Sequence, residues 1–224
     1  MVDFPQLEYP KEVPPLEHSE RMRKSINGMT TLFNTKKIPI DKDKFINNQT
    51  NDFGIALQEV EKNIATLIDE YILKRKNETL ISIFHYIHFW GGITGRNIYN
   101  KNGGFDKNFN IETYKKIVEK IIVLKKDTLY TELKIIEKLF TSIPELGISF
   151  STKHLKFWSL YANQDKIQLS VLDSVLTIRL LHKCTPTWKD YNNYLKQMQD
   201  ESKKKDTTIN ILERQLYNHF NQNK

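Results

Sequence analysis

The spacing of apolar residues is the feature that most constrains the fold. From Asp52 onward, Leu57, Val60, Ile64, Leu67, Ile68 and Tyr71 recur at steps of three and four, which places them on one face of an α-helix. Similar runs predict helices near 80–90, 117–124, 133–141 and 150–162, and two final helices capped by Thr187 and Asp206. No segment alternates as a half-buried strand would, so the spacing predicts an all-α protein.

Composition agrees with helices and suggests how the chain is divided. Only 8 glycines and 7 prolines occur in 224 residues, fewer than many short strands and turns would need. Four prolines in residues 1–24 predict an extended arm, and residues 25–50 are polar and are predicted to be irregular. We therefore expect an N-terminal segment over 1–50 and a helical domain over 51–224, with a glycine-rich loop at 91–110.

The charge balance favours a polyanionic partner. Lys and Arg exceed Asp and Glu by 34 to 27, which gives a net charge of +7 and an isoelectric point near 9.2. Nucleic acid is the first candidate for such a surface. The alternative is a soluble basic protein whose Lys, Asn and Ile content reflects AT-rich codons.

Several function classes are excluded or disfavoured. Cys184 is the one cysteine, so neither a disulfide framework nor a cysteine zinc cluster can form. The N-terminus lacks the basic start and apolar run of a signal peptide, and no stretch approaches the roughly 20 apolar residues of a membrane span. We expect a soluble, cytoplasmic monomer with no membrane partner.

No metal or cofactor is expected. His85 and His88 lie three residues apart and could face one metal ion, but no clear third ligand accompanies them. The glycines at 91–104 match neither GxGxxG nor GxxxxGK[ST], so they do not predict a nucleotide loop.

The chemically informative stretch runs from Ile143 to Leu181. It predicts a helix, a tight turn at 143–147, a second helix carrying Lys153, and then Asp173 between apolar residues. A turn that opens the N-terminus of a helix directs backbone N–H groups outward, and such a turn can hold a DNA phosphate without reading sequence.

These residues resemble a known superfamily. Ile143-Pro144-Glu145-Leu146-Gly147 is similar to the Leu-Pro-Gly-Val/Ile-Gly hairpin of the helix-hairpin-helix DNA glycosylases, in which an aspartate follows the hairpin helix. The closer resemblance, over roughly residues 80–200, is to the bacterial 8-oxoguanine-glycosylase-like family. It rests on Phe89-Trp90-Gly91-Gly92 with Gly95-Arg96, on the run from Gly147 to Leu155, and on Leu172-Asp173-Ser174.

The resemblance implies two helical lobes flanking a cleft, with the hairpin over 139–155, and it implies roles for individual residues. Asp173 would stabilise positive charge on the sugar while the base leaves, and Lys153 would be the amine nucleophile of a bifunctional enzyme. The pocket for an extruded base would involve Phe89, Trp90, Gly91, Gly92, Trp158 and His85. DNA contacts would come from Arg96, Gly147, Ser149, Ser151 and Lys156.

Two departures from the superfamily pattern leave alternatives open. Glu145 replaces the first hairpin glycine and brings a negative charge toward the phosphate site. Ser149 stands where the eukaryotic-type hairpin has its lysine, so an enzyme that uses only Asp173 and water is also possible. Asp173 could serve simply as a helix N-cap, and Lys153 as a solvated residue or a phosphate contact.

We therefore expect a DNA glycosylase that acts on double-stranded DNA with a modified base and leaves an abasic site. Family relatives imply either repair of 8-oxoguanine or defence against phages with glucosylated hydroxymethylcytosine, and the divergent hairpin favours defence. The competing hypotheses are a non-catalytic helix-hairpin-helix DNA-binding module and a helical protein-interaction domain.

Overall fold

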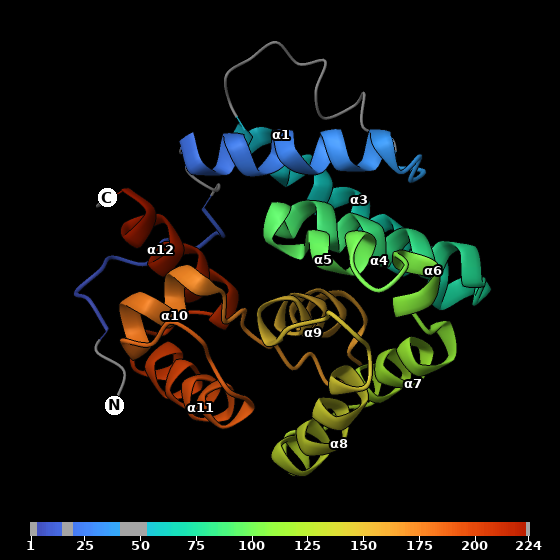
Figure 1. Cartoon of the computed structure of the whole chain (residues 1–224). Coiled ribbons are helices and arrows are strands. Elements are labelled where there is room, and N and C mark those ends of the chain that lie inside the picture. Colours follow the sequence, from blue (N-terminus) through green and yellow to red (C-terminus); the bar gives the residue numbers. More distant parts are fainter. Residues whose placement is uncertain (1–3, 15–19, 41–52, 223–224) are drawn as a thin grey trace.

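Helices make up every regular element in the part of the chain that the computed structural model describes, residues 4–14, 20–40 and 53–222 (Figure 1). The all-α class predicted from periodicity is confirmed. The helices are α1 (Glu20–Thr35), α3 (Phe53–Lys74), α4 (Asn77–Gly91), η1 (Ile93–Arg96), α5 (Asn97–Asn100), α6 (Phe105–Asn108), α7 (Ile111–Ile122), α8 (Leu129–Thr141), α9 (Ile148–Ala162), α10 (Ser174–Leu181), α11 (Trp188–Lys204) and α12 (Ile209–Gln222).

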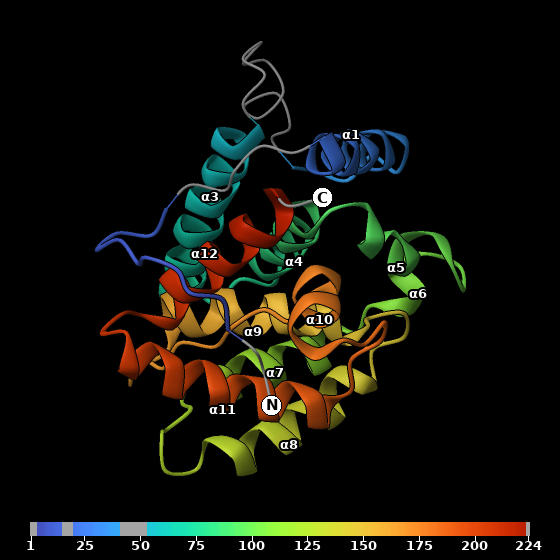
Figure 2. The ribbon, with the colours of Figure 1, turned by 90° about the vertical axis from the view of Figure 1, so that its left-hand side faces the viewer.

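Helix α9 lies at the centre of the molecule. It packs against α3, α4 and α7, while α10 and α11 pack against α12 as a second group (Figures 1 and 2). In Figure 2, α10 and α12 lie on the near side of α9. Helix α1 crosses the top of the molecule and contacts η1 and α4.

The central helix buries polar as well as apolar side chains. All residues of α9 from Phe150 to Ser159 are buried, and this stretch includes two lysines and a histidine. Because buried polar groups are costly unless they have partners, α9 must find hydrogen bonds from neighbouring helices. Tyr114 of α7 supplies one set: its hydroxyl accepts from Trp158 Nε1 at 2.9 Å and lies 2.8 Å from His154 Nδ1.

The predicted irregular structure over 25–50 is wrong for residues 25–35, whereas residues 36–40 carry no helix or strand. Residues 20–35 form α1, because Ile26, Met29 and Phe33 share one face and are buried in the core. The predicted loop over 91–110 contains the short helices η1, α5 and α6. Pro15 and residues 41–52 lie outside the described residues.

Of the two predicted helix caps, one is confirmed and one is wrong. Thr187 caps α11 in a capping box with Asp190, as expected. The cap assigned to Asp206 is wrong, since Thr208 Oγ1 accepts from Ile211 N at 3.2 Å and Asp206 has φ 48°.

The N-terminal residues that the structure describes carry no helix or strand between 4 and 14. Phe4, Leu7 and Tyr9 pack half-buried against the core. No helix among the described residues is both long and apolar enough to cross a bilayer.

We predict that Tyr114→Phe lowers the free energy of unfolding by about 1–3 kcal/mol, because it leaves buried Trp158 Nε1 and His154 Nδ1 without their partner. Tyr130→Phe is the matched control. Its hydroxyl bonds only to Gln199 at the surface, so we expect a change within about 0.5 kcal/mol. Equilibrium urea unfolding of both variants measures the difference, and equal values would contradict the role given to Tyr114.

Candidate active site

Asp173 sits at the start of α10 with its carboxylate held by backbone. Its extended conformation (φ −88°, ψ −178°) makes it the N-cap, and Oδ1 accepts from Val175 N at 2.9 Å and Leu176 N at 3.0 Å. Both of these bonds go to Oδ1, so neither occupies Oδ2. The N-cap role that the sequence offered for Asp173 is therefore present. Asp173 also lines a cavity.

The segment that leads to Asp173 is pinned from two helices. Glu213 of α12 accepts through Oε2 from Ser170 Oγ at 2.8 Å and from Val171 N at 2.6 Å. From α9, Thr152 Oγ1 accepts from Leu172 N at 3.1 Å. Three consecutive residues before Asp173 are thus fixed, which leaves the carboxylate little freedom.

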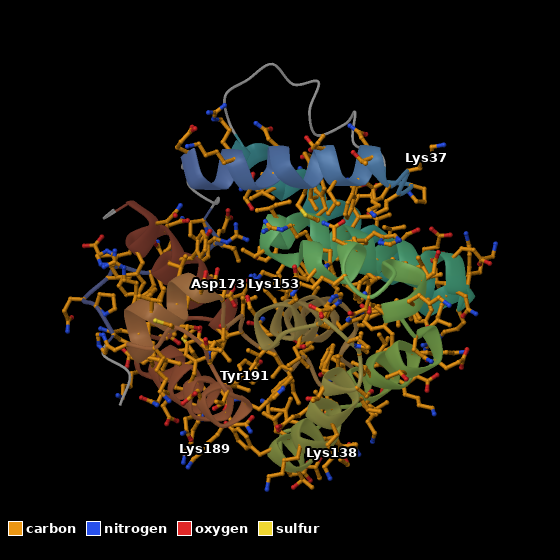
Figure 3. All side chains as sticks on the ribbon, in the orientation of Figure 1. Lys37, Lys138, Lys153, Asp173, Lys189 and Tyr191 are labelled. Carbon is orange, nitrogen blue, oxygen red and sulfur yellow. The ribbon has the colours of Figure 1, made fainter. Side chains whose placement is uncertain are left out.

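Lys153 approaches the same space from α9. Its Nζ donates to Ser149 Oγ at 3.0 Å and to Ser149 O at 3.2 Å, and it lies 4.6 Å from the centre of the Phe150 ring. Burial lowers the pKa of Lys153, while the carboxylates of Asp173 and Glu213 act in the opposite direction. Figure 3 shows Lys153 and Asp173 next to each other between α9 and α10.

Two glycines at the end of α4 make room for this arrangement. A Cβ on Gly91 would lie 2.5 Å from the Phe150 ring and 2.8 Å from Lys153 Cδ. Gly92 has φ 81°, and a Cβ there would lie 2.1 Å from Ser25 Oγ, which itself accepts from Ile93 N. Side chains at these two positions would push α4 away from α9 and α1.

Asp173 and Lys153 both line a cavity of about 470 Å³. Its walls come from α1, α3, the α4–η1 corner, α9, the start of α10, and α12. Trp90, Gly91, Gly92 and Ser149 are also in the lining, so six of the predicted site residues meet here. Trp90 is held by the hydrogen bond from its Nε1 to Glu61 at 2.9 Å.

Three residues assigned to the base pocket lie elsewhere. Trp158 is fully buried against Tyr71, and Phe89 is buried against Phe33. His85 Nδ1 lies 3.0 Å from Tyr99 Oη, and burial lowers its pKa to about 4. None of the three lines the cavity, because their helix faces point into the core.

The residues assigned to DNA contact also separate. Arg96 and Gly147 are exposed, and nothing lies within 4 Å of a Cβ placed on Gly147. Ser151 and Lys156 are buried, so the structure places neither on a DNA-facing surface. Lys156 Nζ instead forms a 2.5 Å ion pair with Glu213.

Glu145 adopts the backbone conformation that the superfamily glycine would provide. It has φ 62°, a left-handed value that favours glycine. Its carboxylate turns to the α5–α6 loop, where it accepts from Asn102 at 3.2 Å and lies 3.5 Å from Lys101 Nζ. The turn thus has a left-handed residue at this position, and Lys101 offsets the negative charge of Glu145.

Helices α12 and α1 also contribute to the cavity, which their sequence patterns did not predict. Glu213, Arg214 and Tyr217 line the cavity from α12, and Lys24, Ser25 and Ile26 line it from α1. The one available signal was Glu213 beside Leu212 and Leu216 on the apolar face of α12. Among the described residues, no group of three or more His, Cys, Asp or Glu side chains could hold a metal ion.

A family model described as "Putative 8-oxoguanine DNA glycosylase OGG-like protein" matches residues 62–217. The chain belongs to this family. The resemblance drawn from the hairpin and Asp173 is thereby confirmed, and the matched range includes the cavity-lining residues of α9, α10 and α12. No curated protein and no solved structure matches the chain.

We predict that Asp173→Asn leaves the stability of this OGG-like protein nearly unchanged, because Asn caps a helix as well as Asp does. Asp173→Ala should lower the free energy of unfolding by about 0.5–2 kcal/mol, since two N–H groups lose their acceptor. Thermal unfolding of the pair checks this. Equal loss in both variants would show that the carboxylate charge, and not the cap, supports α10.

Proposed function

We propose that the protein is a DNA glycosylase that draws a modified base out of the duplex and breaks its bond to deoxyribose. One observation carries the proposal. The carboxylate of Asp173, which caps α10, and the buried amine of Lys153 line the same cavity, next to the turn that precedes α9. Membership of the OGG-like family supports it.

The arrangement suits the chemistry of base excision. When the C1′–N bond breaks, the base leaves with the bonding electrons and takes up a proton, and positive charge develops on the sugar. The carboxylate of Asp173 would stabilise that charge from the wall of the cavity. The positive sugar carbon is then attacked either by water, which leaves an abasic site, or by the Lys153 amine.

The Lys153 route would give a different product. Its neutral amine would add to C1′, lose a proton, and form a Schiff base after the sugar ring opens, and elimination would then cut the strand. Burial favours the neutral amine that this step needs.

The duplex would lie against the hairpin. Helix α9 begins after its exposed N-cap, Gly147, and the first N–H groups of a helix are not used by its internal hydrogen bonds. These amides would hold a phosphate, while exposed Arg96 lies in the η1 corner beside the cavity. Trp90, fixed by Glu61, would offer a ring for the extruded base to stack on.

The cavity volume bears on the substrate. About 470 Å³ falls within the range of pockets that enclose drug-sized ligands, which leaves room for a base with a bulky substituent. We therefore propose glucosylated hydroxymethylcytosine of phage DNA as the substrate and defence as the role. Excision of 8-oxoguanine in repair is the second candidate, favoured by the family description.

We predict that Asp173→Asn reduces excision about 100-fold or more while duplex binding stays within a few-fold of wild type. Asp165→Asn, an exposed residue in the α9–α10 connection, is the matched control and should excise normally. The measurement is single-turnover release of base from duplexes that each carry one modified base, including 8-oxoguanine and glucosylated hydroxymethylcytosine.

The same set of duplexes also distinguishes the two candidate substrates and the non-catalytic alternatives. Activity on 8-oxoguanine alone would end the defence proposal. Salt-sensitive duplex binding without release of any base would favour the non-catalytic module, and no salt-sensitive binding would favour an interaction domain.

For Lys153, we predict that borohydride traps a covalent protein–DNA adduct with wild type and not with Lys153→Gln. The amount of trapped adduct should rise with pH, because the neutral amine is the reactive form. The midpoint of this rise should lie below 10.5, the ordinary pKa of lysine, because burial lowers the pKa of Lys153. Lys189→Gln, on α11 and away from the cavity in Figure 3, is the control. Base release with no adduct would assign the attack to water.

A further inference from the structure

Helix α1 forms one wall of the cavity although it lies outside the range matched by the family. The family model covers residues 62–217, whereas Lys24, Ser25 and Ile26 of α1 are in the lining. Figure 1 shows α1 as the helix that crosses the top of the molecule. The family match therefore says nothing about the role of this wall.

Contacts with the η1 corner fix the position of α1. Ser25 Oγ accepts from Ile93 N at 2.9 Å. A Cβ on Gly28 would lie 3.0 Å from Ile93 Cγ1, so the glycine lets the two segments approach closely. Ile26 is buried in the core. Because Lys24 directly precedes Ser25 and Ile26, its backbone is held beside the cavity while its long side chain can adjust.

Lys24 is the cation of the described lining that solvent reaches. The other cations in that lining are Lys153 and Arg214, which are only 4% and 3% exposed. The side chain of Lys24 is 75% exposed. A side chain that lines a cavity and is also largely exposed lies where the cavity opens. A molecule outside the opening can therefore contact Lys24 directly.

The ammonium of Lys24 is weakly engaged within the protein. Its ion-pair contact among the described residues is with Glu20 Oε1 at 3.8 Å, which is longer than a hydrogen bond. The Glu20 carboxylate is held by Arg23, whose Nε donates to Oε2 at 2.6 Å. An exposed pair at such a distance contributes little, so an anion at the opening can compete for Lys24.

An extruded nucleotide brings anions to this opening. When its sugar lies against Asp173, as the proposed function requires, the base enters the cavity and the two flanking phosphates stay with the strand outside. Asp173 and Glu213 give the lining two carboxylates, which repel a phosphate that approaches. A lysine at the opening offsets this repulsion, since its ammonium binds phosphate as a point charge.

We propose that Lys24 binds one of the two phosphates that flank the extruded nucleotide. This inference rests on the proposed function, because it concerns DNA bound at the same cavity. The contact comes from α1 and is separate from the phosphate site proposed at the start of α9. It carries no sequence information, so it holds the strand in place while the base is recognised inside the cavity.

The test uses a duplex with one tetrahydrofuran abasic nucleotide, so that binding is measured without excision. In two further duplexes, an uncharged methylphosphonate replaces the phosphate on the 5′ side or on the 3′ side of that nucleotide. Wild type should bind at least one of these two duplexes about two- to fivefold more weakly than the parent duplex, which is the range for one exposed ion pair.

Lys24→Met should bind the parent duplex about two- to fivefold more weakly than wild type, and the methylphosphonate that weakens wild type should have no effect on it. Its plot of log affinity against log salt concentration should be shallower by about 0.9, the value for one neutralised phosphate. Lys24→Arg should restore the sensitivity to the methylphosphonate, because it restores the cation.

Lys37→Met is the matched control. Lys37 is exposed just after the end of α1, and Figure 3 shows it away from Asp173 and Lys153. This variant should respond to both methylphosphonates as wild type does. Equal sensitivity of wild type and Lys24→Met, or equal binding of all three duplexes by wild type, would overturn the inference.

Base release from the duplexes with modified bases separates this inference from the proposed function. Excision by a protein whose binding does not depend on Lys24 would leave the glycosylase proposal standing and remove this contact. A phosphate contact that depends on Lys24, without release of any base, would support the contact and end the proposed activity. Failure of wild type to bind the parent duplex at all would overturn both.

Discussion

The buried ion pair between Lys156 and Glu213 is the interaction on which the site depends. It joins the central helix α9 to the C-terminal helix α12, and the second oxygen of Glu213 holds the backbone at Ser170 and Val171. Removing one partner of such a pair typically costs about 3–5 kcal/mol, because the remaining charge stays buried. In this protein the loss of Glu213 would also release the segment that positions Asp173. The stability of the fold and the geometry of the site therefore depend on the same residue.

Helix α9 carries two buried lysines whose surroundings give them different properties. Lys156 has a carboxylate partner at 2.5 Å, which suits a charged structural residue. Lys153, one turn earlier, bonds to the neutral oxygens of Ser149, and burial lowers its pKa. A lysine of this second kind is the one that can lose its proton and react. The two lysines of α9 thus differ in their partners, and the proposed mechanism assigns the reactive role to Lys153.

The hairpin shows how a departure from a family pattern is accommodated. Glu145 has a left-handed backbone conformation although it lacks the freedom of glycine. Its carboxylate lies near Lys101 and accepts a hydrogen bond from Asn102. Gly147, the N-cap of α9, remains exposed. The charge of Glu145, which suggested a weakened phosphate site, is therefore offset by contacts from a loop more than forty residues earlier in the chain.

The sequence by itself determined the all-α class, most helices, the hairpin and the family, and it offered the N-cap role of Asp173 as an alternative, since these depend on local periodicity and motifs within a few turns. It misassigned α1, whose three core residues lie in an otherwise polar run. Only the tertiary structure decided that Lys156 and Ser151 are buried, that Trp158 and His85 face the core, and that Glu213 and Arg214 belong to the cavity. Periodicity tells which face of a helix is apolar. It does not tell which helix from a distant part of the chain packs against that face, and that packing sets the burial, the charge partners and the lining of the site.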